Sequence, residues 1–176
     1  MAATVDEIQY GTYAALTVTN LQSLLADTTD PFTAWQSAQV DNRTTLADDY
    51  EIRVHLTTTA HAPSGDACAY VYLVPWVHDG SVFAPGGNFG TTTLPTGSQG
   101  TASISDPNSM KGPVVIPYKV TSQIMQGYFN VAALCGGIVP DAWSLAIRTA
   151  HCAAGASQGL STGCVVAYRP IKWTNT

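Results

Sequence analysis

Hydrophobic and polar residues alternate without interruption over residues 50–57, which is the pattern of a strand with one face buried. Residues 67–77 are apolar at both odd and even positions and predict a central strand, with Pro75 marking a bulge or an edge near its end. Shorter patterns predict strands over residues 101–105, 113–121, 128–135 and 163–171.

One segment fits two secondary structures. A helix capped by Asp141 would place Trp143 and Ile147 on one side, but residues 142–151 also alternate as a strand does. We expect the strand, because the segments on both sides are strand-like.

Six to eight short strands, frequent turn residues and the lack of a long helical pattern predict an all-β fold. We expect a single β-sandwich, jelly-roll-like domain over residues 50–176. Residues 1–49 lack the alternation and contain only a short helical pattern, Leu21 with Leu24 and Leu25. We expect them to form an acidic N-terminal arm with a short helix and an early strand, ordered by contact with another chain.

The amino-acid composition and the distribution of charge argue against some classes of function. Only 11% of the 176 residues are charged and 45% are hydrophobic, whereas globular proteins average about 25% charged residues. Residues 1–51 carry eight acidic residues against Arg43 alone. Because no basic stripe is present, we expect no direct binding to nucleic acid.

Membrane insertion and secretion are not expected either. No apolar run approaches the ~18 residues that a spanning helix needs, and the first residues lack the pattern of a secretory signal. The four cysteines, Cys68, Cys135, Cys152 and Cys164, contain no CxxC pair. We therefore expect folding in a cytoplasm, with free thiols that are buried as small apolar groups.

Motifs for catalysis or metal binding are present only as fragments. Residues 155–159 match the G-x-S-x-G nucleophile elbow around Ser157, but the required helix does not fit before the next strand. Cys135 could pair with His151 as a nucleophile, yet Cys135 lies in an apolar run that favours core packing. The four histidines do not form a ligand set. We expect no enzymatic activity, no metal and no cofactor.

Two further features favour binding over catalysis. Residues 86–90 form a glycine-rich loop without dinucleotide-binding spacing and suit contact with a partner. Tyr70, Tyr72 and Trp76 share one face of their strand, so a sugar-stacking platform stays open beside ordinary core packing. The aromatic residues considered for it are Tyr70, Tyr72, Trp76, Trp143, Tyr168 and Trp173.

Three segments resemble a group of tailed-bacteriophage virion proteins. They are residues 35–42 (WQSAQVDN), residues 69–72 (AYVY) and residues 138–147 (IVPDAWSLAI), which looks like the Pro-x-x-Trp strand of that group. In place of the Asn-x-Ser/Thr-Gly turn that often follows this strand, the chain has residues 149–152 (TAHC). The similarity covers roughly residues 33–171 and implies a small jelly-roll-like domain that decorates or cements a capsid.

The resemblance to these virion proteins also implies where the protein lies and which partners it binds. A decoration or cement protein would lie on the capsid surface of the virion, bind the major capsid protein and copies of itself, and assemble in the host cytoplasm. A homotrimer is the expected oligomer. The candidate contact aromatics are Phe32, Trp35, Phe83 and Phe89, because large apolar groups in irregular segments suit interface anchors. The alternative is a carbohydrate- or receptor-binding module of a phage fibre or tail.

Overall fold

Strand β5 (Asp49–Thr57) shows how the sequence pattern builds the fold. Its even-numbered residues from Tyr50 to Leu56 are buried, while its odd-numbered residues are partly exposed. This confirms the strand predicted from the alternation. The computed structural model describes residues 6–24, 32–59, 63–78, 80, 83–85, 99–102, 110–118, 122–152 and 159–175.

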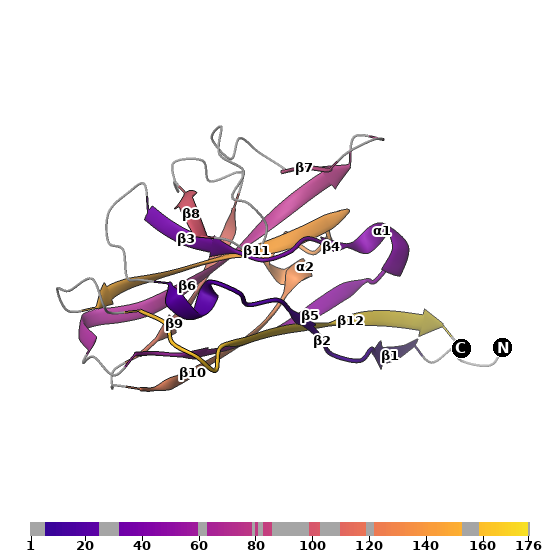
Figure 1. Ribbon diagram of the computed structural model, residues 1–176. Coiled ribbons are helices and arrows are strands. Elements are labelled where there is room, and N and C mark those ends of the chain that lie inside the picture. Colours follow the sequence, from indigo (N-terminus) through magenta and orange to yellow (C-terminus); the bar gives the residue numbers. More distant parts are fainter. Residues whose placement is uncertain are drawn as a thin grey trace.

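Two antiparallel sheets pack face to face (Figure 1). The first has the strand order β1-β12-β5-β10, with β2 also paired to β12. Its other strands are β1 (Asp6–Tyr10), β2 (Ala14–Leu16), β10 (Ile124–Asn130) and β12 (Val165–Asn175).

The second sheet has the order β7-β6-β11-β3-β8, with β9 paired to β6 and β4 paired to β11. Its strands are β3 (Phe32–Gln36), β4 (Val40–Asp41), β6 (Pro63–His78), β7 (Phe83–Pro85), β8 (Gln99–Ala102), β9 (Lys111–Pro117) and β11 (Ala142–Cys152). At Pro75, β6 pairs with β11 on one side; on the other, β9 pairing ends at Leu73 and β7 pairing begins at Trp76. A residue without an N–H donor is tolerated at such a partial edge.

The connections follow the jelly-roll pattern. Eight principal strands, taken in chain order as β2, β3, β5, β6, β9, β10, β11 and β12, are divided equally between the sheets, and each connection except β6 to β9 crosses from one sheet to the other. Numbered one to eight, they are ordered 1-8-3-6 in the first sheet and 2-7-4-5 in the second. This double Greek-key arrangement is the jelly roll and confirms the predicted all-β sandwich.

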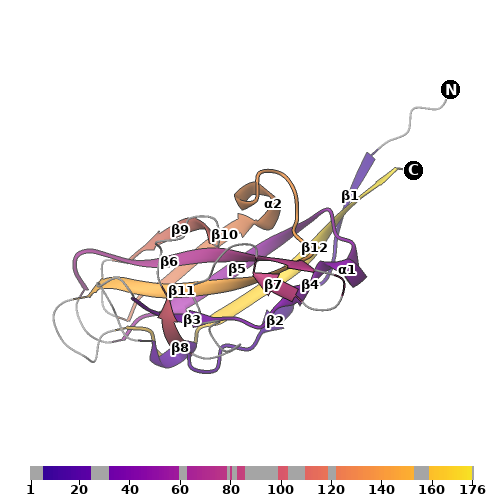
Figure 2. The same cartoon turned by 90° about the horizontal axis from the view of Figure 1, so that it is seen from above.

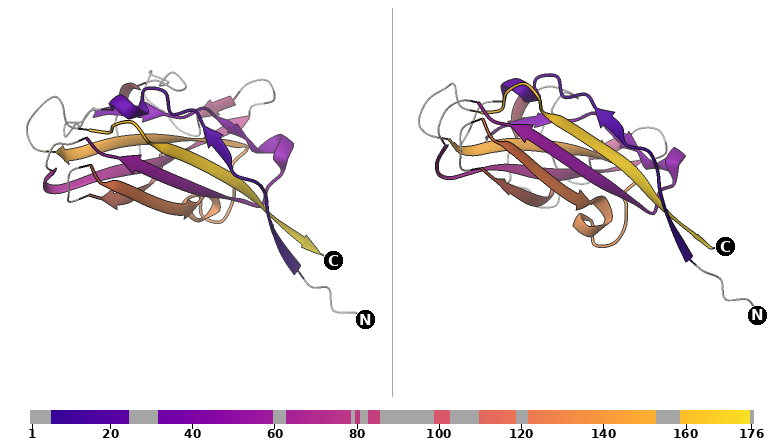
Figure 3. Two further views of the ribbon diagram at one scale, coloured as in Figure 1. Left: turned by 60° about the horizontal axis from the view of Figure 1, so that its bottom comes forward. Right: turned by 90° about the horizontal axis from the view of Figure 1, so that it is seen from below.

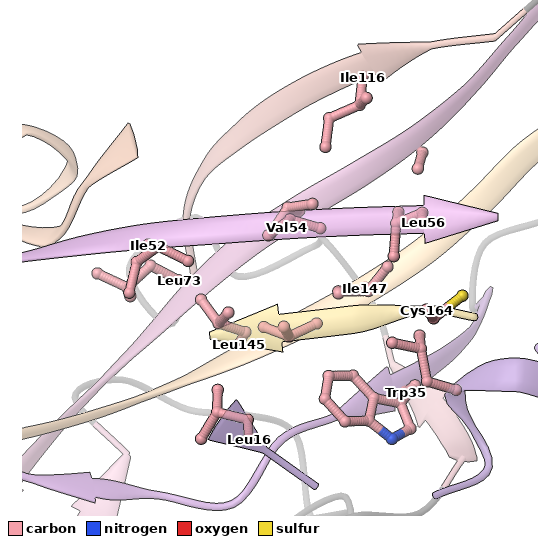
Figure 4. Packing of buried hydrophobic residues seen from close by; sticks show 14 of the residues in the cluster. Leu16, Trp35, Ile52, Val54, Leu56, Leu73, Ile116, Leu145, Ile147 and Cys164 are labelled. Carbon is pink, nitrogen blue, oxygen red and sulfur yellow. The ribbon is translucent and has the colours of Figure 1, made fainter. Parts of the chain in front are cut away.

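The core lies between the inner faces of the two sheets (Figure 4). Val54 and Leu56 of β5 face Leu145 and Ile147 of β11, and all four are fully buried. At one end Trp143 meets Tyr50 and Tyr168 edge-to-face, with ring centroids 5.4 and 5.3 Å away. Edge-to-face contacts add to the stability that burial of apolar area supplies.

The N-terminal segment is part of this sandwich, so the expected arm over residues 1–49 is corrected. Strands β1 and β2 pair with β12, and β3 pairs with β11. The helical pattern forms the single 3₁₀ turn η1 (Leu21–Ser23), and Leu21 and Leu24 are fully buried in the core. In the described residues, position 49/50 therefore lies within the fold and does not separate an arm from a domain.

One strand prediction was too long and another is confirmed. The segment 128–135 is divided, because β10 ends at Asn130 and the short helix α2 (Val131–Leu134) follows. The ambiguous segment 142–151 is strand β11, as expected. A second short helix, α1 (Asn42–Thr45), begins where the Asp41 carboxylate accepts a hydrogen bond from the Arg43 backbone N–H.

The chain ends of the described structure extend beyond the rest of the sandwich. Strand β1 and residues 171–175 of β12 form a two-stranded ribbon that runs outward, and at its tip β1 begins and β12 ends (Figures 2 and 3). We call this segment the ribbon. None of the helices in the described ranges is long and apolar enough to span a membrane.

Candidate interaction surface

Of the four aromatic residues predicted to contact a partner, Trp35 is the one whose side chain the structure describes. Trp35 lies in β3, is fully buried, and its indole N–H donates to the Thr19 backbone oxygen at 2.9 Å. This burial removes Trp35 from the surface anchors and assigns it to the core. Phe32 and Phe83 begin β3 and β7, but their side chains lie outside the described part, as does the whole of Phe89.

The outer face of the first sheet carries most of the large hydrophobic side chains that are exposed in the described residues. Because Ile52 and Val54 point into the core, Glu51 and Arg53 of β5 point outward. Directly opposed residues of paired strands lie on the same side of a sheet, so the strand register identifies the outward residues of the neighbouring strands. Arg169 is opposite Glu51, and Tyr128 is opposite Arg53.

This outer face collects exposed hydrophobic side chains. Of the eleven large hydrophobic side chains exposed in the described ranges, seven lie here. We define the aromatic face as these seven: Ile8, Tyr10, Tyr13, Ile124, Tyr128, Val165 and Trp173. Their exposed fractions range from 38% for Tyr13 to 64% for Trp173. A gathering of exposed hydrophobic side chains on one face marks a candidate binding surface.

Arg169 occupies the centre of the aromatic face. Its guanidinium lies 4.3 Å from the ring centroid of Tyr10 and 4.9 Å from that of Tyr13. Its Nη2 pairs with Oε2 of Glu51 at 2.9 Å, and the Tyr13 hydroxyl donates to Oε1 of the same carboxylate. Both carboxylate oxygens and the cation are therefore held within one cluster, which we call the Arg169 cluster.

The electrostatics of the Arg169 cluster follow from these contacts. The hydrogen bond from Arg169, then that from Tyr13, lowers the pKa of the Glu51 carboxyl. The Tyr13 pKa is raised because its hydroxyl donates to that carboxylate. One positive and one negative charge cancel, so the cluster offers a neutral, pre-arranged aromatic surface instead of a site for a free anion.

A second arginine–tyrosine contact extends the surface toward β10. The Arg53 guanidinium lies 6.0 Å from the centroid of Tyr128, at the limit of a cation–π contact. Ala167, between Arg53 and β2, has only a small side chain and leaves this part of the sheet flat. Tyrosine, tryptophan and arginine are the residues enriched in protein–protein interfaces.

The aromatic face continues onto the ribbon, beyond the other strands of the sandwich. On one side Ile8 is opposite Trp173 and Tyr10 is opposite Ile171. The other side is polar; its residues are Glu7, Gln9, Lys172 and Thr174. A shallow hollow of about 170 Å³ next to Gly11 and Pro170 is smaller than the 300–1,000 Å³ typical of ligand pockets.

The sugar-stacking platform considered from the sequence is not open. Tyr70 and Tyr72 do stack on the outer side of the second sheet, with centroids 6.5 Å apart. Tyr72, however, is only 5% exposed. Trp76 is held by a 2.9 Å hydrogen bond from its indole N–H to Ser144 Oγ. Trp143 is buried and Tyr168 packs against the core, which leaves Trp173 of that set exposed.

The residues considered for chemistry are not assembled into a reactive site. Cys135 follows α2 and packs against the core, where burial raises the pKa of its thiol, opposite to what a nucleophile needs. Ser157 and the side chain of His151 lie outside the described residues. Within the described residues, no three metal-ligating side chains form a group. Cys68 and Cys164 are free and buried, as expected.

Comparison with known proteins gives no family assignment. Neither a scan against protein-family models nor a search of the curated proteins finds a match to the sequence. The function must therefore be argued from the surface itself. Sequence reasoning missed Tyr10, Tyr13, Tyr128 and Arg169, because these residues come from three segments far apart in the chain and share no local motif.

Proposed function

We propose that this protein is a non-enzymatic structural protein of a tailed-phage virion, a decoration or cement protein that stabilises the capsid. The observation that carries the proposal is the aromatic face: a broad apolar sheet surface on a jelly-roll domain. Jelly rolls recur among viral capsid proteins. Fold alone does not imply function, so the argument depends on this surface and on the resemblance of residues 35–42, 69–72 and 138–147.

The composition of the aromatic face supports a protein partner over a small ligand. The Arg169 guanidinium and both Glu51 oxygens are already engaged with each other and with Tyr13. Tyr128 and Trp173 stand exposed on the same side of the sheet. Rigid aromatic side chains held around this ion pair offer much contact area at a low entropic cost.

A cement role requires only differential binding. A protein that binds the assembled shell better than the free capsid subunits stabilises the assembled state by mass action. The partners in this proposal are the major capsid protein and further copies of this chain, at the outer surface of the capsid. No bond is made or broken in such a role.

Co-sedimentation with shells of the phage that encodes the protein tests this proposal. The test variant carries Tyr10→Ser, Tyr128→Ser and Trp173→Ser, all on the aromatic face. The matched control carries Val77→Ser, Val115→Ser and Ile138→Ser, which are also exposed but lie elsewhere. We expect saturable binding of the wild type and the control, and at least about tenfold weaker binding of the face variant.

Two results would decide against the proposal. If wild-type protein does not bind the shells at all, the virion role is removed, and a glycan array tests the receptor-binding alternative. If face variant and control bind equally, the aromatic face is not the binding surface. Point variants are needed here because removal of residues 1–49 would delete strands of both sheets.

A further inference from the structure

We infer that the aromatic face binds a second copy of this chain, so that the free protein is a homo-oligomer before it meets any shell; face variants then bind shells more weakly because single copies lose the avidity of the oligomer. The inference names the occupant of the surface described above, and it rests on the proposed function only for treating that surface as a protein interface. The inference rests on the area of the aromatic face, on its charge distribution and on the shape of the ribbon.

The area of the aromatic face matches one side of a stable interface. Aromatic side chains carry on the order of 150–250 Å² each. Four aromatic and three aliphatic side chains, each about half exposed, therefore present roughly 600–800 Å². A standard protein interface buries about 800 Å² on each partner. Two copies of this face are thus sufficient to form one.

The charge distribution favours another copy over a charged partner. The chain carries a formal charge of −5, but the aromatic face does not share this surplus. On it Glu51 is paired with Arg169, and Arg53 adds one positive charge beside Tyr128. Glu7 lies on the polar side of the ribbon, whereas the Asp48 carboxylate borders the face and accepts a 2.7 Å hydrogen bond from the Trp173 backbone N–H. On the outward side of β5 and β12, Asp49 and Glu51 are balanced by Arg53 and Arg169, so two such faces can approach without a large like-charge repulsion.

The ribbon provides the reach that contact between copies requires. It extends beyond the other strands of its own sheet (Figures 2 and 3), and its side chains Ile8 and Trp173 are 58% and 64% exposed. At the opposite end of β12, Val165 lies eight residues from Trp173, which is about 26 Å along a strand. The apolar surface is therefore long, and its two ends can be covered together by the equally long surface of a second copy.

The mass of the purified protein in solution tests this inference without any phage component. Sedimentation velocity is measured from about 1 to 100 µM, and the monomer mass is 18.5 kDa. We expect the wild type to sediment as a multiple of this mass. The Tyr10→Ser/Trp173→Ser variant and the Tyr128→Ser/Val165→Ser variant should dissociate at least about a hundredfold more readily. The Val77→Ser/Val115→Ser control should remain assembled.

A second measurement on unmodified protein guards against variants that fail to fold. Amide hydrogen exchange of the wild type should slow in β1 and β10 as the concentration rises, because association covers these edge strands. A wild type that is monomeric at about 100 µM overturns the inference. So does an oligomer that neither face variant weakens, or exchange that does not depend on concentration.

The outcomes separate this inference from the proposed function. A monomer that binds shells through the aromatic face keeps the virion role and assigns the face to the capsid protein instead. An oligomer that dissociates in the face variants but does not bind shells keeps the inference and removes the virion role.

Discussion

Arg169 shows how individual residues build the aromatic face. Its charge is paired with Glu51, and its flat guanidinium fills the space between the rings of Tyr10 and Tyr13. A lysine could match the charge but not the planar stacking. The residue therefore fixes the orientation of two exposed aromatic side chains, and a partner that binds them does not need to order them first.

Replacement of the Glu51 carboxylate should have a pH-dependent effect on stability. Because Arg169 lowers the pKa of Glu51 in the folded state, the ionised carboxylate stabilises the fold above the ordinary glutamate pKa of about 4.3. This contribution is lost as the pH falls through the lower, folded-state pKa. We expect Glu51→Gln to reduce Tm by about 1–3 °C at pH 7 and by nothing measurable near pH 2.

Differential scanning calorimetry across this pH range makes the comparison. Glu7→Gln, which changes an exposed carboxylate on the polar side of the ribbon, is the matched control and should behave as wild type. An effect of Glu51→Gln that stays constant down to pH 2 would contradict the ion-pair assignment.

Two tryptophans with opposite environments provide a second test at the residue scale. Trp35 is fully buried and hydrogen-bonded, whereas Trp173 is 64% exposed. We expect Trp35→Ala to lower the free energy of unfolding by about 3–5 kcal/mol and Trp173→Ala to lower that of the dissociated monomer by less than about 1 kcal/mol. Urea denaturation of both variants measures this difference, and equal losses would show that the burial assignment is wrong.

At the scale of secondary-structure elements, prediction succeeded where the pattern is local. The alternation over residues 50–57 predicts β5, and the apolar run 67–77 predicts most of β6, because each strand carries its own two-residue period. The helix α2 could not be found in this way. Its first turn is held by Asp49, which accepts hydrogen bonds from the Ala132 N–H at 2.9 Å and from the Asn130 side chain at 2.7 Å. That capping partner lies more than eighty positions earlier in the chain.

The N-terminal segment was misjudged for the same physical reason. Strand β1 has only five residues and pairs with residues 171–175, at the far end of the sequence. Neither segment shows a long alternating pattern, and pairing so distant in the chain leaves no local signal. The aromatic face leaves no local signal in the sequence for the same reason, because β1, β2, β10 and β12 form one surface only after the jelly roll has assembled them.

Loss of the Asp49 cap should destabilise the corner formed by α2 and β10. Asp49→Ala removes the acceptor for three donors, the N–H groups of Tyr50 and Ala132 and the Asn130 side chain, and we expect it to lower the free energy of unfolding by about 1–2 kcal/mol. Asp49→Asn keeps one side-chain oxygen and should cost less. Urea denaturation measures both variants, and an Asp49→Ala variant as stable as wild type would contradict this role.

Removal of the N-terminal segment tests whether it belongs to the sandwich. A chain of residues 50–176 lacks β1, β2 and β3 and exposes the core surface that Leu21 and Trp35 cover. We expect the full chain to show a cooperative thermal transition and the truncated chain to lose it. Near-UV circular dichroism and a thermal scan measure this, and a native-like transition would restore the interpretation of residues 1–49 as a separate arm.

At the scale of the whole molecule, different surfaces of the two sheets have different roles. The inner faces of the two sheets form the core, while the outer side of the second sheet is largely covered at Tyr72, Val74 and Ala146. The outer side of the first sheet remains open and aromatic. A sandwich with one covered and one open face is suited to present that open face to another protein.

The central claim is that the protein stabilises a shell, and the heat stability of the shell tests it most directly. Shells of the encoding phage that lack this protein are heated with and without a saturating amount of it, and the temperature of disassembly is recorded by light scattering. The account predicts that wild-type protein and the Val77→Ser/Val115→Ser/Ile138→Ser control raise this temperature by several degrees, and that the Tyr10→Ser/Tyr128→Ser/Trp173→Ser variant does not. An unchanged disassembly temperature with wild-type protein at saturation would contradict the account.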